Sequence, residues 1–288
     1  MVNAILLAGT HADKSKLFYG KNKAFIEING KPVILNVLNA LQNAKHINKV
    51  AVVGPRIDLE KVINSEVDII DESLAPKESR RFIENVMVPY NFLSNKYGQG
   101  PTFITACELP VFSPDTVDSF IENCDELDFQ WGLINTKYLP PEIERLKKSA
   151  PLDLKERGYF RTANMALCDW SNISDKKREF IEHLVGKAFP IRRTASKWAK
   201  RRLKLFILGH YPKLTKKYYT ERTLTENDIK SALKKKPGIS FGIVETDDWR
   251  AAADIDDKDE LALYNNKKTY DKLMNNFTPY QDNQHQSQ

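Results

Sequence analysis

The chain opens with a short, wholly apolar run, Val2–Ala8, that ends at Gly9. A run of this length is typical of a central strand in a parallel sheet, where both faces of the strand are buried. Similar runs predict further strands at 49–53, 67–70, 102–107, 129–134, 160–167 and 239–245. The pattern therefore predicts several buried strands spread along most of the chain.

Segments with apolar residues at helical spacing lie between these strands. Pro32 is well placed as the first residue of one helix. Another helix is predicted to start after the capping residue Ser113, because Pro114 and Asp115 suit its first turn. Further helices are predicted at 79–93, 175–185, 196–208, 225–235 and 258–264. Strands that alternate with helices in this way predict an α/β fold with a mostly parallel sheet sandwiched by helices.

Composition favours one globular domain. The 288 residues are 41% hydrophobic, 10% aromatic and 28% charged, which predicts a soluble globular protein and excludes a disordered or fibrous one. No Pro/Gly/Ser-rich linker divides the chain, so we predict one domain over 1–274. It would consist of a core at 1–135, a helical elaboration at 136–238 and a return to the core at 239–274. The Gln/Asn-rich segment 275–288 is predicted to be a disordered tail.

The cysteines and the apolar segments bear on location. Cys107, Cys124 and Cys168 are widely spaced and show no zinc-binding pattern, which favours reduced thiols in the cytoplasm. The N-terminal apolar run is too short for a signal peptide and lacks a basic flank. No run approaches the ~18 apolar residues of a membrane span. We therefore expect a cytoplasmic protein, with contact to the membrane surface left as an alternative.

The positive charge of the chain is concentrated in one segment. The formal net charge is +6, yet residues 187–222 carry twelve Lys/Arg against one acidic residue, so the rest of the chain is negative. Interleaved aromatic residues such as Trp198 leave three interpretations open. The segment is a helix at an anionic membrane surface, a basic lid over an anionic acceptor, or a core-packed helix with a solvated basic face. Nucleic acid is not predicted as a partner, because no recognised binding motif accompanies the charge.

Two stretches near the N-terminus suit the binding of phosphates. Leu7, Ala8, Gly9 and Thr10 form a loop of small residues after the first strand, at the sheet edge where α/β proteins bind ligands. Backbone N–H groups in such a loop can approach a phosphate or a base. Four lysines follow, namely Lys14, Lys16, Lys21 and Lys23. Such cations can neutralise a triphosphate, but for an isolated loop a solvated lysine cluster is the favoured interpretation.

Two acidic stretches suit a divalent metal ion. Glu108 directly follows the buried strand 102–107, where a carboxylate is costly unless it is paired or bound to metal. Asp256 lies in the acidic segment 254–261. The alternative interpretation of this segment is the start of a helix with Asp257 as the capping residue. Mg²⁺ commonly takes one or two carboxylates together with substrate phosphates.

Taken in order, these stretches resemble the MobA-like NTP transferases, a group of nucleotidyltransferases with a Rossmann-like, GT-A-like core. The group includes molybdenum-cofactor guanylyltransferases and cytidylyltransferases that act on sugar and polyol phosphates. Its motifs LAGG, K, GKPLI, GDLP, TPE and D-[I/V]-D-T-P-E-D-L are matched in order and spacing over about 260 residues. The matching segments are Leu7–Gly9, Lys23, Gly30–Ile34, Glu108–Pro110, Ser113–Asp115 and Asp254–Leu261.

The resemblance implies an EC 2.7.7-type enzyme that transfers a nucleoside monophosphate from an NTP to a phosphorylated sugar, polyol or cofactor, with release of pyrophosphate. CTP or GTP would be favoured over ATP as the donor. Leu7, Ala8, Gly9 and Thr10 would hold the nucleotide, and Lys23 would contact its phosphates. Glu108 and Asp256 would hold Mg²⁺, or Mn²⁺, between the α-phosphate and the acceptor. Oligomeric state and acceptor identity are not implied.

The position of the middle segment in such enzymes implies acceptor binding by Arg157, Arg161 and Asn164, for which a strand with exposed arginines is the alternative. Three departures from the family pattern affect the activity that the resemblance implies. Thr10 replaces the second glycine, Glu108 replaces an aspartate, and Lys14 or Lys16 must replace an arginine whose bidentate fork a lysine lacks. These departures keep open a catalytically weak nucleotide-binding or membrane-associated module of the same fold.

Overall fold

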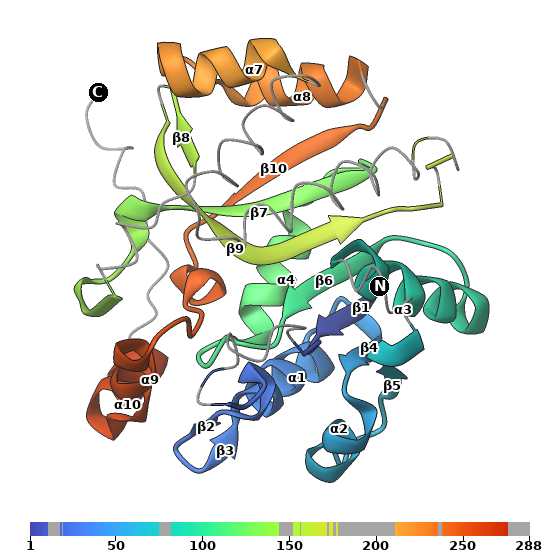
Figure 1. Cartoon of the computed structure of the whole chain (residues 1–288), viewed down its shortest axis with the longest axis vertical. Coiled ribbons are helices and arrows are strands. Elements are labelled where there is room, and N and C mark those ends of the chain that lie inside the picture. Colours follow the sequence, from blue (N-terminus) through green and yellow to red (C-terminus); the bar gives the residue numbers. More distant parts are fainter. Residues whose placement is uncertain are drawn as a thin grey trace.

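The computed structural model describes residues 1–10, 18, 20–74, 82–143, 152–155, 157–171, 173–174, 177, 211–235 and 238–275. Their centre is an eight-stranded sheet with the order β10-β7-β9-β6-β1-β4-β5, to which β8 is added beside β9 (Figure 1). The strands are β1 (Val2–Leu7), β4 (Ile47–Gly54), β5 (Asp68–Asp71), β6 (Thr102–Ala106), β7 (Phe129–Asn135), β8 (Leu152–Leu154), β9 (Gly158–Cys168) and β10 (Phe241–Thr246).

The sheet is mostly parallel, as the sequence predicted. Parallel pairing joins β1 to β4 and β6, β4 to β5, and β7 to β10. Only β9 among the described strands runs the other way, because it is antiparallel to β6, β7 and β8. The carboxyl ends of the parallel strands therefore meet at one edge, together with the start of β9. This carboxyl edge is where open α/β sheets bind their ligands.

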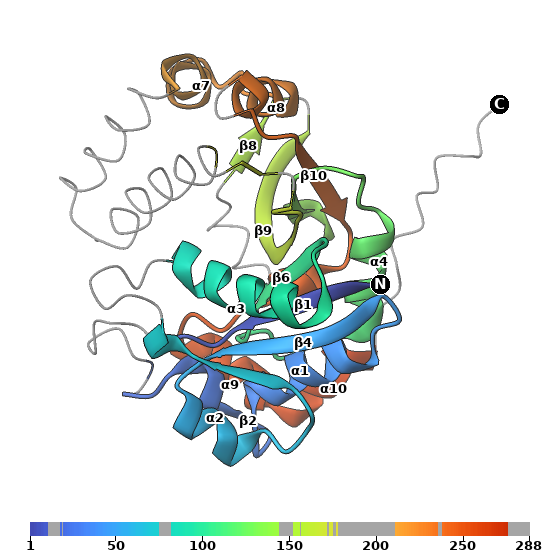
Figure 2. The ribbon, with the colours of Figure 1, turned by 90° about the vertical axis from the view of Figure 1, so that its right-hand side faces the viewer.

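Helices cover both faces of the sheet (Figure 2). The helices are α1 (Val33–Asn43), α2 (Arg56–Val62), α3 (Phe82–Tyr97), α4 (Pro114–Glu122), α7 (Pro212–Lys216), α8 (Glu226–Lys235), α9 (Lys258–Asn265) and α10 (Lys267–Asn275). Alternate residues of a strand point to opposite faces. Leu6 accordingly packs with Ile34 of α1 on one face. Ile5 packs with Val86 of α3 on the other.

Two predicted helix starts are confirmed by their capping groups. The Ser113 side chain accepts a hydrogen bond from the Thr116 N–H at the start of α4. The Asp228 N–H bonds the Thr225 hydroxyl at the start of α8. The helix expected from Pro32 begins one residue later, at Val33, because the backbone of Pro32 is still extended.

Other elements differ from the sequence expectation. Helices α2 and α10 were not predicted, since they are short and polar and bury few side chains, chiefly Leu59 and Leu273. The helices predicted at 175–185 and 196–208 fall almost entirely outside the described residues, as does the predicted tail apart from Asn275, the end of α10. No helix in the part of the chain that the structure describes is long and apolar enough to cross a lipid bilayer.

Candidate metal and nucleotide site

Three carboxylates meet at the carboxyl edge of the sheet. Glu108 directly follows β6, while Asp254 and Asp256 follow the short 3₁₀ helix η7 (Trp249–Ala252), which comes after β10. One oxygen from each carboxyl group lies within 4.8 Å of the others. A backbone hydrogen bond from the Ile255 N–H to the Glu108 carbonyl, 3.1 Å long, ties the two segments together. We call Glu108, Asp254 and Asp256 the carboxylate cluster.

Asp256 is held in place by the start of α9. The Asp257 side chain accepts hydrogen bonds from the N–H groups of Asp259 and Glu260 and so caps the helix. The buried Glu260 carboxylate in turn accepts from the N–H groups of Asp256 and Asp257, at 2.5 and 3.1 Å. This capping box occupies Asp257, as predicted, and leaves the Asp256 side chain available to the cluster.

Lys23 joins two members of the cluster. It lies in the 3₁₀ turn η2 (Lys23–Phe25), and its Nζ is 2.8 Å from Glu108 Oε2 and 2.6 Å from Asp256 Oδ1. Burial alone would lower the pKa of Lys23, but the Glu108 and Asp256 carboxylates more than offset this and raise it. Burial also raises the pKa of Glu108, against the opposing effect of Lys23. The structure thus brings Lys23, Glu108 and Asp256 together, as the sequence predicted.

Asp254 is the member of the cluster to which the sequence assigned no role. It is buried, and its Oδ1 accepts a hydrogen bond of 3.0 Å from the Arg161 guanidinium at the start of β9. Burial, with a further contribution from Asp256, raises the pKa of Asp254 to about 7 despite the opposing effect of Arg161. The sequence signal for Asp254 was its place as the first aspartate of the matched motif, two residues before Asp256. Its cationic partner is distant in sequence.

The Leu7–Thr10 loop lies at the same edge. The Ala8 N–H donates to the Val53 carbonyl, 2.8 Å away, so the loop continues the pairing of β1 with β4. Gly9 faces two polar side chains: an added Cβ would lie 2.9 Å from Asn85 Nδ2 and 3.3 Å from Glu72 Oε2. A side chain at this position would require one of these two side chains to shift.

Asn22 connects this loop to Lys23. Its Nδ2 donates to the Ala8 carbonyl at 2.8 Å and to the Thr10 hydroxyl at 3.2 Å. Its Oδ1 accepts from the Ala24 N–H at 2.9 Å and so caps the turn that carries Lys23. The hydroxyl of Thr10, which replaces a glycine of the family pattern, is therefore a hydrogen-bonding partner within the site.

Glu72 closes the other side of the loop. It begins the 3₁₀ turn η3 (Glu72–Leu74), directly after β5, and is buried. Its Oε2 accepts a hydrogen bond of 2.6 Å from the Thr10 N–H. Nearby, Asn85 of α3 buries its Oδ1 without a hydrogen-bond partner among the described residues. The sequence interpretation missed both residues, although Glu72 shows the same signal as Glu108, an acidic residue directly after a buried strand.

The residues predicted to bind the acceptor occupy three different environments. Arg157 forms ion pairs with Glu226 and Glu245 and lies over the Phe160 ring. Arg161 is buried against Asp254. Asn164 is half-buried within β9, where the pairing with β7 is irregular, and has a positive φ of 47°. The two arginines are thus engaged by acidic side chains, and acceptor binding stays a prediction for all three residues.

Several predicted features fall outside the described residues, namely Lys14, Lys16 and positions 187–210 of the basic segment with Trp198. In the described remainder of that segment, Lys216 pairs with Glu221 at 2.8 Å, and Lys217 pairs with Asp228 of α8 at 2.6 Å. Part of its positive charge is therefore neutralised by neighbouring acidic residues.

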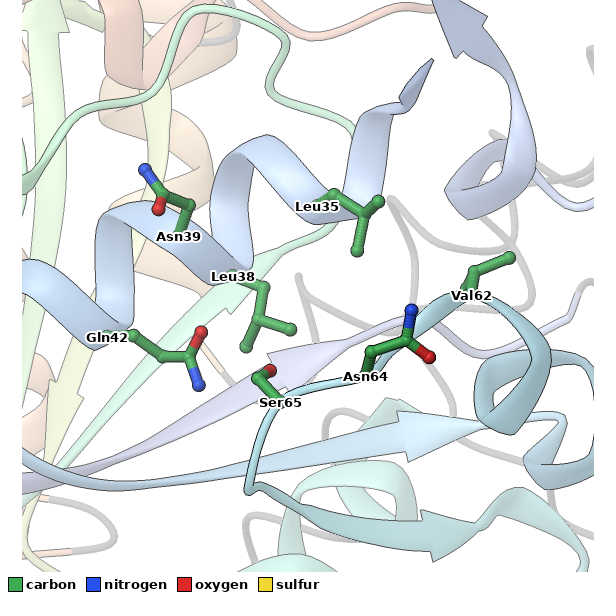
Figure 3. A pocket seen from close by; sticks show the side chains of 7 residues that line it. All are labelled: Leu35, Leu38, Asn39, Gln42, Val62, Asn64 and Ser65. Carbon is green, nitrogen blue, oxygen red and sulfur yellow. The ribbon is translucent and has the colours of Figure 1, made fainter. Parts of the chain in front are cut away.

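A hollow elsewhere on the surface contains no titratable side chain (Figure 3). It lies between α1 and the chain after α2 and is lined by Leu35, Leu38, Asn39, Gln42, Val62, Asn64 and Ser65. The hollow lies near the amino end of β5, away from the carboxyl edge of the sheet. Among the residues that the structure describes, only the carboxyl edge combines a small-residue loop, a cation and clustered carboxylates. Carboxylate oxygens are the donors that Mg²⁺ and Mn²⁺ prefer, so this donor set fits such an ion.

The sheet topology and the helices on both of its faces define a GT-A-like, Rossmann-like α/β protein. Residues 4–135 match the family model of the MobA-like NTP transferase domain. This match covers β1 to β7 and includes Lys23 and Glu108, whereas Asp254 and Asp256 lie beyond it.

Two curated relatives show how far the sequence similarity extends. The chain is 29% identical over 122 residues to a protein of Thermococcus gammatolerans, and 23% identical over 126 residues to one of Thermococcus kodakarensis. Both carry the name probable molybdenum cofactor guanylyltransferase, and the alignments cover 42% and 44% of this chain. The chain spans about half the length of these curated relatives, 55% in each case.

The fold is also similar to that of a solved structure from Thermus thermophilus, described as a hypothetical transferase. The TM-score is 0.64 at 18% sequence identity, and the match covers 90% of this chain and 99% of the other. The similarity therefore extends beyond residues 4–135 to most of the fold. It supports the predicted GT-A-like fold over nearly the whole chain.

Proposed function

We propose that this protein is a nucleotidyltransferase that moves a nucleoside monophosphate from an NTP to a phosphorylated small molecule, with a divalent metal ion and release of pyrophosphate. The observation that carries the proposal is the convergence of Lys23 with the carboxylate cluster beside the Leu7–Thr10 loop. The match of residues 4–135 to the MobA-like NTP transferase family model supports the same class of reaction.

In this reaction an oxygen of the acceptor phosphate attacks the α-phosphorus in line, a P–O bond forms, and pyrophosphate leaves. The protein contributes positioning and charge stabilisation. The backbone of the Leu7–Thr10 loop would orient the nucleotide, and the Lys23 ammonium would neutralise charge on the phosphates as it builds up. Glu108, Asp254 and Asp256 would hold Mg²⁺. The ion supplies further neutralisation of phosphate charge.

The loop also suggests which base is bound. Glu72 presents a carboxylate next to Gly9 and Thr10, and Asn85 buries an amide oxygen without a partner among the described residues. The two oxygens of the Glu72 carboxylate are acceptors that match a base edge with adjacent donors. Guanine has such an edge, with its N1–H and N2 amino group. Of the two donors expected from the sequence, we therefore propose GTP over CTP.

Pyrophosphate release, measured with each NTP and a panel of phosphorylated sugars, polyols and cofactors, tests the proposal. We expect turnover with GTP and at least one acceptor. Glu72→Gln should lower the preference for GTP over CTP about tenfold, because the amide offers one acceptor fewer to the base. Glu66→Gln, at an exposed position before β5, is the matched control. GTP binding without pyrophosphate release for any acceptor would favour the catalytically weak module instead.

Asn22 provides a test of the loop itself. Asn22→Ala removes the hydrogen bonds to Ala8 and Thr10, each worth about 1 kcal/mol. The affinity for the preformed Mg–GTP complex, measured by calorimetry, should fall about fivefold or more. Asn43→Ala removes a comparable bond to the Asn39 carbonyl on the exposed side of α1 and should leave the affinity unchanged. Equal affinities of the two variants would exclude a role of Asn22 in shaping the loop.

A further inference from the structure

The ammonium group of Lys23 lies between the carboxylates of Glu108 and Asp256, at 2.8 and 2.6 Å. These two side chains belong to the three that converge within 4.8 Å. The third, Asp254, is paired with the Arg161 guanidinium at 3.0 Å. Each carboxylate in the cluster therefore already has a cationic partner in the protein, without any added ion.

This arrangement affects how a metal ion enters. A divalent cation that uses the same oxygens would lie only a few ångströms from the Lys23 ammonium, where like charges repel strongly in a partly buried site. Lys23 is only 26% exposed, so water screens this repulsion incompletely. A metal ion on its own must therefore displace Lys23 from both carboxylates, with no new anionic partner for the lysine.

A nucleoside triphosphate changes this balance. Its phosphates offer the lysine an alternative set of anionic oxygens, next to the loop that precedes the lysine in the sequence. Lys23 is anchored through its backbone by the Asn22 cap, so only its flexible side chain has to move. When the side chain turns to the phosphates, Glu108 and Asp256 are released to bind the metal ion.

We propose that Lys23 is the resident cation of the carboxylate cluster and couples metal binding to nucleotide binding, so that the divalent ion is retained only together with the triphosphate. The inference rests on the proposed function. Because coupling between two ligands is reciprocal, the metal ion must strengthen nucleotide binding by the same factor. This coupling prevents the carboxylate cluster from holding a metal ion in the absence of the nucleotide.

Mn²⁺ binding to the full chain without nucleotide, followed by electron paramagnetic resonance, tests the inference. Lys23→Met should bind Mn²⁺ about tenfold more tightly than the wild type, because the competing cation is gone. Lys45→Met removes the same charge at an exposed position between α1 and β4, and should leave the affinity unchanged. Lys23→Gln, which keeps a hydrogen-bonding side chain, should show the same gain as Lys23→Met. Equal or weaker Mn²⁺ binding by the Lys23 variants overturns the inference.

A second measurement uses the wild-type chain and so does not depend on the folding of a variant. The side-chain ammonium signal of Lys23 in ¹⁵N NMR should change little with Mg²⁺ alone and shift when the preformed Mg–GTP complex is added. A full shift with Mg²⁺ alone would contradict the coupling. Failure of Mg–GTP to bind at all would instead contradict the proposed function. Binding of Mg–GTP without the predicted gain in the Lys23 variants would contradict only the coupling.

Discussion

Replacing Glu108 by glutamine, or Asp256 by asparagine, is expected to lower kcat for pyrophosphate release by at least ~10²-fold, the scale seen when a group that stabilises charge in a transition state is lost. Each substitution keeps the shape of the side chain but removes one negative charge from the carboxylate cluster, where the oxygens lie within 4.8 Å of one another. Asp254→Asn should have an effect of the same order. Steady-state kinetics at saturating Mg²⁺ measure all three.

Asp259→Asn is the matched control for these variants. Asp259 is exposed in the first turn of α9, three residues after Asp256, and its side chain is not part of the cluster. The control should retain turnover within a factor of about two, since an exposed charge contributes little. Circular dichroism and thermal melting should show that the cluster variants are folded. Wild-type turnover in folded Glu108 and Asp256 variants would remove these residues from the mechanism.

Arg161→Met is expected to cause the largest loss of stability, about 3 kcal/mol in the free energy of unfolding. Arg161 and Asp254 are almost fully buried, with side chains 10% and 13% exposed, and pair at 3.0 Å. Removing the arginine leaves a buried carboxyl group without its cationic partner. The pKa of Asp254 should then rise further, because burial and Asp256 already raise it and Arg161 opposes them. Urea denaturation at neutral pH measures the effect.

Two further variants test whether the loss of stability comes from the buried Arg161–Asp254 ion pair. Arg157→Met makes the same chemical change four residues earlier, directly before β9, but Arg157 is 34% exposed, so its loss should cost less. The double variant Arg161→Met/Asp254→Asn should recover part of the stability, because the unpaired charge is removed together with its partner. A double variant that is less stable than Arg161→Met alone would show that the pair does not compensate a buried charge.

The strands of the core were predictable because they are uninterrupted apolar runs, and such runs arise where both faces of a strand are covered. β1 and β6 match their predicted bounds within a residue or two. The direction of β9 was not predictable, since apolar periodicity is the same for parallel and antiparallel strands. Helices α2 and α10 were missed because they bury too little apolar surface to produce a helical pattern.

The candidate site likewise contains residues that the sequence predicted and residues that it did not. Lys23, Glu108 and Asp256 were predicted from motifs, and each lies directly next to a regular element that sets its position. Asp254 was not singled out, because its importance depends on Arg161, which is 93 residues away in the sequence. Glu72 was missed because the preceding strand is short and ends with a second acidic residue, Asp71, which obscured the signal.

The sequence separation within the site has a consequence for biosynthesis. Lys23 and Asp256 are in contact although they are 233 residues apart, and the Asn29 N–H in the hairpin of β2 (Glu27–Ile28) and β3 (Lys31–Pro32) donates to Asn265 at the end of α9. A nascent chain that has reached residue 135 already contains the whole segment that matches the family model, yet two of the three carboxylates of the cluster have not been translated. The cluster therefore forms only after the ribosome has added Asp254 and Asp256, and the contact of Asp256 with Lys23 requires that the first and last parts of the fold have joined.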